Sequence, residues 1–400
     1  MPPTTAAPPR RAAVTVTALC WVIVVFDGYD LIVYGTALPQ LFTEPGWGLT
    51  PSAAGLLGSL AFAGMLVGAV LAGTLADRLG RRRVVLLCSL WFSVCTGLCA
   101  VAPGPEVFGA LRFLAGLGLG GLVPSASALT AEFVSPRHRS LVSTLMMSGV
   151  PVGGCVAALV GIPVLPTAGW RPMFALGLLA LLVVPVALRW LPESPAAPRP
   201  ATVSRPLRTL TRPPYRRPTA LFVLATTMTL FTWYGLATWL PQLMRQSGVN
   251  LGSALTYLLA LSLGAVAGSL VTAWAGTRFG PVPTGIGASL AAALGLLLLL
   301  TGPGPALAYG ALVLAGIGTH GTQCLVIAAV ASHYPAHLRG SALGFALGFG
   351  RVGAVLAPQT GGWLLAAGLG TNANFTTFAA AAAACAVLLA LVPREGARTP

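Results

Sequence analysis

The chain carries very little charge. Only 8% of its 400 residues are charged, against roughly 25% in a soluble domain, and 56% are hydrophobic. It has no lysine, so all 23 basic residues are arginines, and it has only eight acidic residues. This composition excludes a soluble globular protein and predicts an integral membrane protein. The net charge of +15 does not indicate a nucleic-acid partner, because the arginines lie mostly in short loops between apolar runs.

The sequence also lacks the residue spacings of a metal site or an enzyme. Its seven cysteines all fall within apolar segments, and none belongs to a Cys-x-x-Cys or Cys/His pattern. We therefore interpret them as small packing residues. No nucleophile and base occur at a common depth in the membrane, so we expect neither an enzyme nor a bound metal or cofactor.

Apolar runs long enough to cross a bilayer are what the sequence has in abundance. Each crossing needs about 20 apolar residues, and twelve such runs occur. They lie at residues 14–40, 51–76, 83–103, 106–131, 140–164, 170–191, 218–244, 251–275, 281–301, 304–331, 339–367 and 374–392. The sequence therefore predicts an all-α membrane protein with twelve transmembrane helices.

The longest polar connection, PESPAAPRPATVSRPLRTLTRPPYRRP, separates the sixth run from the seventh. It is rich in proline and arginine and has no apolar periodicity, which predicts a disordered linker. The chain then divides into a six-helix half at 1–191, a linker at 192–217 and a second six-helix half at 218–400.

The loop arginines predict the orientation of the chain in the membrane. Basic residues favour the cytoplasmic side, and the loop arginines fall on the side of the linker and both termini, except Arg171 and Arg245. We therefore expect a multi-pass protein of the bacterial cytoplasmic (plasma) membrane with both termini in the cytoplasm. We also expect it to function as a monomer in the lipid bilayer.

The two halves repeat each other at an offset near 200 residues. LAGLGLGG at 114–121 matches LAGIGTHG at 314–321, and Arg139 matches Arg339, each of which opens a run. Several matches in one order and register indicate an internal duplication. Two pseudo-symmetric six-helix bundles are the layout of a major facilitator transporter, in which substrate binds near the bilayer midplane between the halves.

The loop between the second and third runs, GTLADRLGRRR, resembles the major facilitator signature G-x-x-x-D-R-x-G-R-R. The matching positions are Gly73, Asp77, Arg78, Gly80, Arg81 and Arg82. Gly73 would permit close helix packing, and Asp77 and Arg78 would form charge-assisted contacts at the end of a neighbouring helix. The equivalent loop of the second half keeps Arg278 but has Thr277 in place of the aspartate. We therefore expect the stronger gating contact in the first half.

Two carboxylates lie inside the first apolar run, in the stretch WVIVVFDGYDLIVYG. Asp27 lies about 20 Å along this helix, near the middle of the bilayer, and Asp30 follows at i+3 on the same face. A buried aspartate costs about 2.5–3.5 kcal/mol on insertion, and burial beside a second carboxylate favours the protonated form. The repeat-equivalent residues are Thr229 and Thr232, so symmetric packing does not require the pair. We interpret the aspartates as a proton-coupling site. The structural alternative is that an aspartate forms hydrogen bonds with backbone groups left unpaired where the helix loosens.

Two arginines also lie within apolar runs. Arg351 is about twelve residues inside the eleventh run, where it could hold a substrate carboxylate in bidentate fashion or pair with Asp27 or Asp30. Arg112 lies in the outer third of the fourth run, in RFLAGLGLGG. That segment resembles the superfamily pattern R-x-x-x-G-x-G, which is linked to proton coupling. Snorkelling of Arg112 to the outer surface is the alternative.

Three further polar residues are candidates for a gate or a substrate site. Glu132 lies near the cytoplasmic end of the fourth run, where it could pair with loop arginines in a gate. His320 lies inside the tenth run, where Gly120 is its repeat equivalent. A lone histidine of this kind is either a packing residue or a ligand. Gln323 of the same run joins His320 among the substrate-binding candidates.

Three aromatic residues complete the predicted substrate site. Tyr34 follows Asp30 at i+4 on the first run. Phe231 and Tyr234 lie deep enough in the seventh run to stack on an aromatic ring. Trp239 of that run is instead typical of an interfacial anchor.

Three segments resemble the aromatic acid:proton symporter family. DGYDLIVYG carries the D-G-x-D motif of that family, and two longer segments are also similar to it. These are RFLAGLGLGGLVPSASALTAEF, with Arg112 and Glu132, and RGSALGFALGFGR, with Arg339 and Arg351. The resemblance runs from about residue 14 to residue 392.

The resemblance implies an importer that carries a small aromatic carboxylate together with protons. Benzoate, hydroxybenzoates, protocatechuate and gentisate are the substrates of that family. By this resemblance Asp27 and Asp30 would couple protons, and Arg351 would anchor the carboxylate. Arg339, which opens the eleventh run, would belong with Glu132 to the gating residues.

A proton-coupled efflux antiporter for drugs or metabolites is the alternative function. The segment SGVPVGG is close to the antiporter pattern G-P-x-x-G-G, but Val150 separates Gly149 from Pro151. A deep arginine suits an anionic substrate better than the cationic drugs that such pumps export. A membrane sensor would need a soluble output domain, and no loop is long enough to form one.

Overall fold

The computed structural model describes residues 10–135, 139–193 and 208–393. Twelve segments of this part are long and apolar enough to cross a membrane, which confirms the predicted number. The first half contains α1 (Arg10–Leu41), α2 (Pro51–Leu79), α3 (Arg81–Cys99), α4 (Pro105–Phe133), α5 (Arg139–Ala168), α6 (Arg171–Ala175) and α7 (Val183–Trp190). The second contains α9 (Arg216–Gln246), α10 (Leu251–Phe279), α11 (Pro281–Leu299), α12 (Pro305–His333), α13 (Ala336–Ala366) and α14 (Gly370–Ala390). No strand occurs in the described ranges.

The ends of the helices show the same internal duplication as the sequence. The side chain of Thr50 caps α2 by accepting from the backbone N–H of Ala53, and Asn250 caps α10 in the same way. Gly80 and Gly280 then join α2 to α3 and α10 to α11 at φ angles of 87° and 89°. Only glycine adopts such angles without strain, so each half turns at an equivalent glycine.

The sixth crossing is the irregular one, because it consists of three helical pieces. A 3₁₀ helix at Leu176–Leu182 lies between α6 and α7. This segment packs closely on α3: a Cβ at Gly177 would meet Thr96, and a Cβ at Gly97 would meet Leu178. The sixth crossing therefore supports the part of α3 that carries Thr96.

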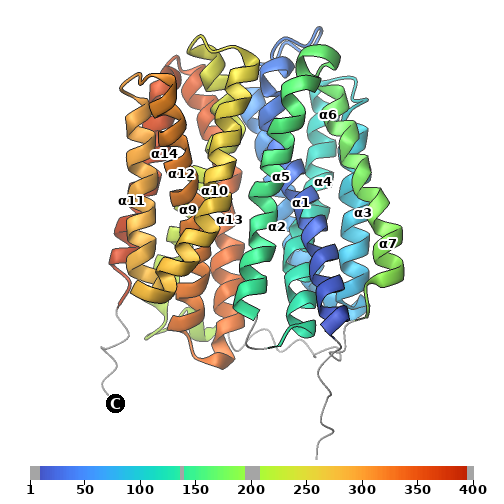
Figure 1. The fold of residues 1–400 in the computed structure, drawn as a ribbon, viewed down its shortest axis with the longest axis vertical. Coiled ribbons are helices and arrows are strands. Elements are labelled where there is room, and N and C mark those ends of the chain that lie inside the picture. The colour runs from blue at the N-terminus through green and yellow to red at the C-terminus, as the bar shows by residue number, and fades with distance from the viewer. Residues whose placement is uncertain (1–9, 136–138, 194–207, 394–400) are drawn as a thin grey trace, which may run out of the picture.

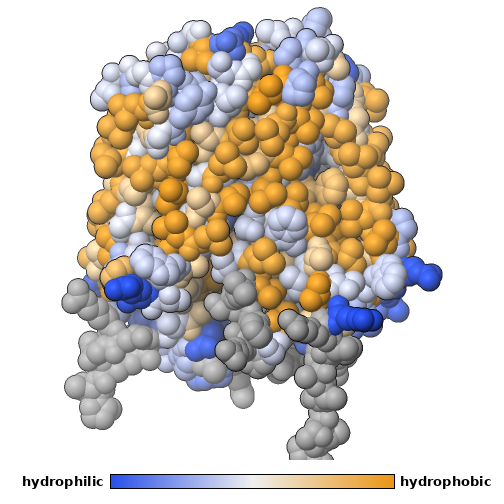
Figure 2. Space-filling view, in the orientation of Figure 1, coloured by the Kyte–Doolittle hydropathy of each residue, from blue (hydrophilic) through white to orange (hydrophobic). Residues whose placement is uncertain are grey.

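The two halves stand side by side in the membrane. Figure 1 shows both chain ends of the described part, at Arg10 and beyond Ala390, at the lower end of the bundle. We call this the terminal end and the opposite one the far end. Figure 2 shows an apolar belt between two more polar ends, as expected for a membrane protein. Contacts between the halves run through α2 with α13, α5 with α10 and α1 with α9.

The predicted linker is only partly described. Residues 194–207 lie outside the described residues. Residues 208–215, which we predicted as part of a disordered linker, instead form a helical turn followed by turns that lead into α9. Leu210 is buried, and the ring of Tyr215 is tilted against that of Tyr334 of the second half, with ring centres 5.6 Å apart. The prediction is wrong here because these two apolar side chains anchor the segment to the second half.

The seam between α2 and α13 is closed at the far end. Gln359 donates from Nε2 to the Ser52 carbonyl at 3.3 Å, and Ser59 donates to the Val355 carbonyl at 2.6 Å. Gly55 lies so close to α13 that a Cβ there would collide with the Pro358 carbonyl. The two helices therefore touch along their far halves.

The same seam is open toward the terminal end. Gly73 lies on the face of α2 that contacts α13 farther along the helix. The corresponding face of α13 carries Gly340, Gly344 and Gly348. A Cβ at any of these four glycines would meet no atom within 4 Å. The close packing predicted for Gly73 is thus not made in this conformation, in which the α2–α13 seam is open at its terminal end.

We predict that two cysteines introduced on α2 will differ sharply in reactivity. Gly73→Cys should react rapidly with a maleimide in the purified protein, and Ser59→Cys should react much more slowly, because Ser59 is 5% exposed. Alkylation rates followed by mass spectrometry would measure this, with the parent protein as the background control. Equal rates for the two variants would contradict the assigned conformation.

Candidate functional site

Asp30 is held inside the first half by three hydrogen bonds from two neighbouring side chains. Arg112 of α4 donates from Nη1 to Asp30 Oδ2 at 2.9 Å and from Nη2 to the Asp30 carbonyl oxygen at 3.2 Å. Thr96 of α3 donates its hydroxyl to Oδ1. The side chains of Asp30 and Arg112 are 0% and 1% exposed, so this ion pair is fully removed from solvent. The snorkelling alternative for Arg112 is therefore wrong.

Aromatic rings surround this buried ion pair. The guanidinium carbon of Arg112 lies 6.0 Å from the ring centre of Tyr34 and 5.9 Å from that of Phe174. Tyr34 itself donates its hydroxyl to the Ala54 carbonyl at 2.6 Å. The structure thus places Tyr34 beside Arg112 within the first half, and its hydroxyl already has a partner.

Asp27 is equally buried but has a different environment. It is 1% exposed, and its Oδ1 atom has no hydrogen-bond partner in the described part of the chain. No ion pair of Asp27 is found among those residues either. Arg351 nevertheless lies near it, across the boundary between the halves. The backbone of α1 stays helical through Gly28, so the structural alternative of a loosened backbone does not explain Asp27.

Arg351 lies midway along α13, at the point where the closed part of the seam ends. Its Nη1 atom donates to the carbonyl oxygens of Met65 on α2 and Gly120 on α4, at 3.2 and 3.3 Å. Both bonds cross from the second half to the first. The guanidinium retains further donors for an anion, and the side chain is only partly buried.

Aromatic and polar side chains of the second half border the same region. Tyr234 of α9 lies near both Asp27 and Arg351, and its ring centre lies 4.5 Å from that of Phe62 on α2. The preceding residue, Trp233, faces His320 of α12 with ring centres 5.7 Å apart. Asp27, Arg351 and Tyr234 thus form a central group that joins the two halves.

Phe231 does not join this group. It packs on Phe378 of α14, with ring centres 5.8 Å apart. It therefore lies within the second half, one helical turn before Tyr234 on α9. Its predicted role in substrate stacking finds no support in this arrangement.

Comparison with known proteins decides the family. The Major Facilitator Superfamily model matches residues 20–358 and 260–400. The chain belongs to the major facilitator superfamily. It is therefore a multi-pass membrane transporter and not an enzyme. A D-xylose-proton symporter has the same fold, with a TM-score of 0.79 at 18% identity over 96% of this chain and 98% of that chain.

Curated relatives of this superfamily member are similar along nearly the whole chain. A gentisate transporter of Corynebacterium glutamicum is 50% identical, covering 96% of this chain and 88% of the relative. A benzoate transport protein of Acinetobacter baylyi is 34% identical, covering 90% and 85%. A 4-hydroxybenzoate transporter of Pseudomonas aeruginosa is 32% identical, covering 94% and 91%.

The superfamily's signature loop fastens helices of the first half to one another. Arg81 forms an ion pair with Glu132 at the end of α4 and also donates to the Ala128 carbonyl at 3.3 Å. Arg82 donates to the Leu188 carbonyl of α7 at 2.5 Å. The loop pairing predicted for Glu132 is thus present, and it ties α3 to α4.

The remaining signature and gating residues make no described contact between the halves. Arg78 and Arg339 are exposed at the terminal end, and the side chain of Asp77 lies outside the described residues. Gly80 makes the turn into α3. In this conformation, whose α2–α13 seam is open at the terminal end, the gating role predicted for these residues stays a prediction.

Sequence reasoning missed three residues of the site. Thr96 holds Asp30, Phe62 faces Tyr234, and Trp233 faces His320. Trp233 had a usable signal, because a tryptophan at the centre of a transmembrane helix cannot act as an interfacial anchor. Thr96 and Phe62 had none, since threonine and phenylalanine are ordinary in apolar helices.

Proposed function

We propose that this transporter imports aromatic carboxylates together with protons. The observation that carries the proposal is the central group, in which buried Asp27 of the first half and Arg351 of the second lie near Tyr234. A guanidinium suits a carboxylate, and Tyr234 with Phe62 offers ring faces to an aromatic substrate. The relatives that transport gentisate, benzoate and 4-hydroxybenzoate support the same substrate class.

The proposed mechanism is alternating access. Substrate and a proton enter when the far end is open, the carboxylate binds Arg351, and the proton neutralises Asp27. With Asp27 neutral, Arg351 is free to hold the substrate anion, and the halves rock about the central group. Release occurs at the terminal end, which we propose faces the cytoplasm. The pH gradient drives this import, and the membrane potential contributes if more than one proton moves per anion.

The efflux alternative loses its main support in this structure. The glycines of SGVPVGG pack α5 onto α1: a Cβ at Gly153 would collide with the Val25 carbonyl, and one at Gly149 would meet Val24. Close helix packing therefore accounts for these glycines without an antiporter motif.

The test is uptake of labelled 2,5-dihydroxybenzoate by cells that express the protein and lack their own aromatic acid transporters. We expect uptake that a protonophore abolishes and that other aromatic carboxylates inhibit more strongly than aliphatic dicarboxylates. Absence of uptake, together with increased resistance to cationic dyes, would favour efflux instead.

Arg351→Lys is expected to raise the KM for the aromatic acid about tenfold, which corresponds to roughly 1.4 kcal/mol, with little change in the maximal rate. Lysine keeps the positive charge but loses the planar fork that matches a carboxylate. Initial uptake rates over a range of concentrations measure both parameters. Arg245→Lys, at an exposed arginine on α9, is the matched control. An unchanged KM in Arg351→Lys would move the anchor to another residue.

A further inference from the structure

Three buried polar atoms of the second half have no hydrogen-bond partner in the described part of the chain. They are the indole N–H of Trp233, Nε2 of His320 and Oε1 of Gln323. Their residues are 3%, 5% and 6% exposed, so bulk water does not satisfy them. A buried polar atom that stays unpaired destabilises the protein, because it has lost its hydrogen bonds to water. Unpaired buried groups in a native protein call for an explanation.

The three side chains lie on facing sides of two helices. His320 and Gln323 are three residues apart on α12 and therefore share a face. Trp233 of α9 faces His320, with ring centres 5.7 Å apart. All three lie near the middle of their helices, at the depth of Asp27 and Arg351.

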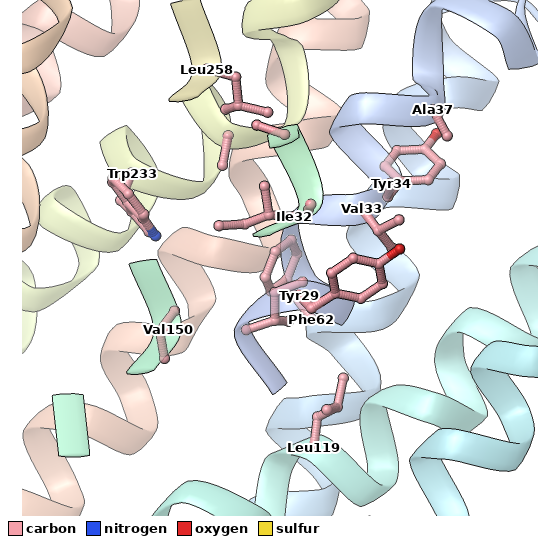
Figure 3. Close-up of a cluster of buried hydrophobic side chains, with 14 of the residues drawn as sticks. Tyr29, Ile32, Val33, Tyr34, Ala37, Phe62, Leu119, Val150, Trp233 and Leu258 are labelled. Atoms are coloured by element: carbon pink, nitrogen blue, oxygen red, sulfur yellow. The ribbon is translucent and has the colours of Figure 1, made fainter. Parts of the chain in front are cut away.

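This cluster borders the boundary between the halves. Figure 3 shows the indole nitrogen of Trp233 directed toward Ile32 and Val150, which belong to α1 and α5 of the first half. The His320 side chain likewise meets the backbone of Met147 on α5. Trp233 and His320 thus lie where the second half meets α1 and α5 of the first half.

Helix α9 connects this cluster to the proposed carboxylate anchor. Trp233 and Tyr234 are consecutive residues, and they point to different neighbours. Trp233 faces His320, whereas Tyr234 packs on Phe62 near Arg351 and Asp27. An aromatic substrate whose ring lies beside Tyr234 and whose carboxylate binds Arg351 would therefore lie in the same central region as the unpaired atoms.

We propose that Trp233, His320 and Gln323 form a subsite for the ring hydroxyl groups of a hydroxylated aromatic carboxylate. The indole N–H donates to a phenolic oxygen, and Oε1 of Gln323 accepts a phenolic proton. Nε2 of His320 serves either role, according to its tautomer. The subsite rests on the proposed function and adds a preference for hydroxylated rings, because an unsubstituted ring would leave all three atoms unpaired.

The buried hydroxyl of Thr319, next to His320 on α12, does have a hydrogen-bond partner. Thr319 is buried at 2% exposure, but its hydroxyl donates to the Ala315 carbonyl at 2.7 Å. Its polar requirement is met within the helix. Thr319→Val is therefore a matched control beside His320.

The experiment compares 2,5-dihydroxybenzoate with benzoate in the purified full chain in detergent. Binding constants come from the ligand-dependent rise in melting temperature. Gln323→Met and Trp233→Phe should each weaken 2,5-dihydroxybenzoate about tenfold, the loss expected for one hydrogen bond to a buried partner. Benzoate affinity should change little, so the ratio of the two constants falls. Thr319→Val should leave this ratio at the wild-type value.

The outcomes separate the subsite from the proposed function. If both variants keep the wild-type ratio of the two binding constants, the subsite is overturned while aromatic acid transport stands. The ratio also stays at the wild-type value if the affinities for both acids fall equally. Failure of the wild-type protein to bind any aromatic carboxylate would overturn the proposed function itself. The two variants lie on different helices, so a folding defect in one leaves the other as the test.

Discussion

Arg112→Leu is expected to destabilise the protein by about 3–5 kcal/mol, the usual effect of breaking a buried ion pair by removing one partner. Asp30 loses two hydrogen bonds from the guanidinium and keeps only Thr96. The carboxylate then lies in the first half, 0% exposed and without a counter-charge. Thermal unfolding of the purified protein, followed by tryptophan fluorescence, measures the change.

Removal of both charges is the control for this prediction. The double variant Asp30→Asn with Arg112→Leu should recover much of the lost stability, because no uncompensated charge remains in the bundle. A double-mutant cycle with the two single variants gives the coupling between the residues. If Arg112→Leu unfolds at the wild-type temperature, the ion pair has no structural role and the first half is held by packing alone.

Asp27→Asn is expected to abolish accumulation of the aromatic acid while leaving the stability of the protein nearly unchanged. Asp27 has no ion pair to lose among the described residues, and Oδ1 already lacks a hydrogen-bond partner. Asparagine keeps the size and much of the polarity of the side chain, but it cannot take up or release a proton. Uptake against a gradient should therefore fail, whereas exchange of external for internal substrate should continue.

Two measurements together test this prediction. Net uptake and counterflow exchange are compared for Asp27→Asn and wild type at matched surface expression, with the melting temperature as the folding control. Wild-type accumulation by Asp27→Asn would end its proposed role as the proton carrier. Loss of exchange at a normal melting temperature would instead place Asp27 in substrate binding.

The sequence alone could not show that Asp27 and Asp30 have different neighbours. Their i, i+3 spacing predicted a shared buried face, and both are buried. Their partners come from other helices, however: Arg112 and Thr96 hold Asp30, while Arg351 lies near Asp27. Periodicity along one helix says nothing about which neighbour lies opposite. The sequence therefore located the carboxylates and left their separate environments open.

The fold was more predictable than the site, because the bilayer restricts the chain to long apolar helices. Apolar runs predicted all twelve crossings, and the repeat predicted equivalent turns such as those at Gly80 and Gly280. The 3₁₀ segment Leu176–Leu182 was not predicted, since its apolar sequence suits an ordinary helix equally well. Its close approach to α3, where a Cβ at Gly177 would meet Thr96, is a tertiary contact that the sequence does not show.

The signature loop illustrates a second limit of sequence reasoning. The motif predicted a gate, and the structure shows contacts of Arg81 and Arg82 within the first half. Gly73 is open on the α2 face whose far part is closed against α13. A motif does not say in which conformation its residues make their contacts, so the sequence could not predict that Gly73 is open here.

The most direct test of proton-coupled import is a transport measurement in proteoliposomes that contain only this protein. A pH gradient, acidic outside, is imposed in the presence of labelled 2,5-dihydroxybenzoate and a pH-sensitive dye in the lumen. The account predicts accumulation above the external concentration, lumenal acidification that depends on substrate, and the loss of both with a protonophore. Uptake that stops at equal concentrations and moves no protons, or net export driven by the same gradient, would contradict it.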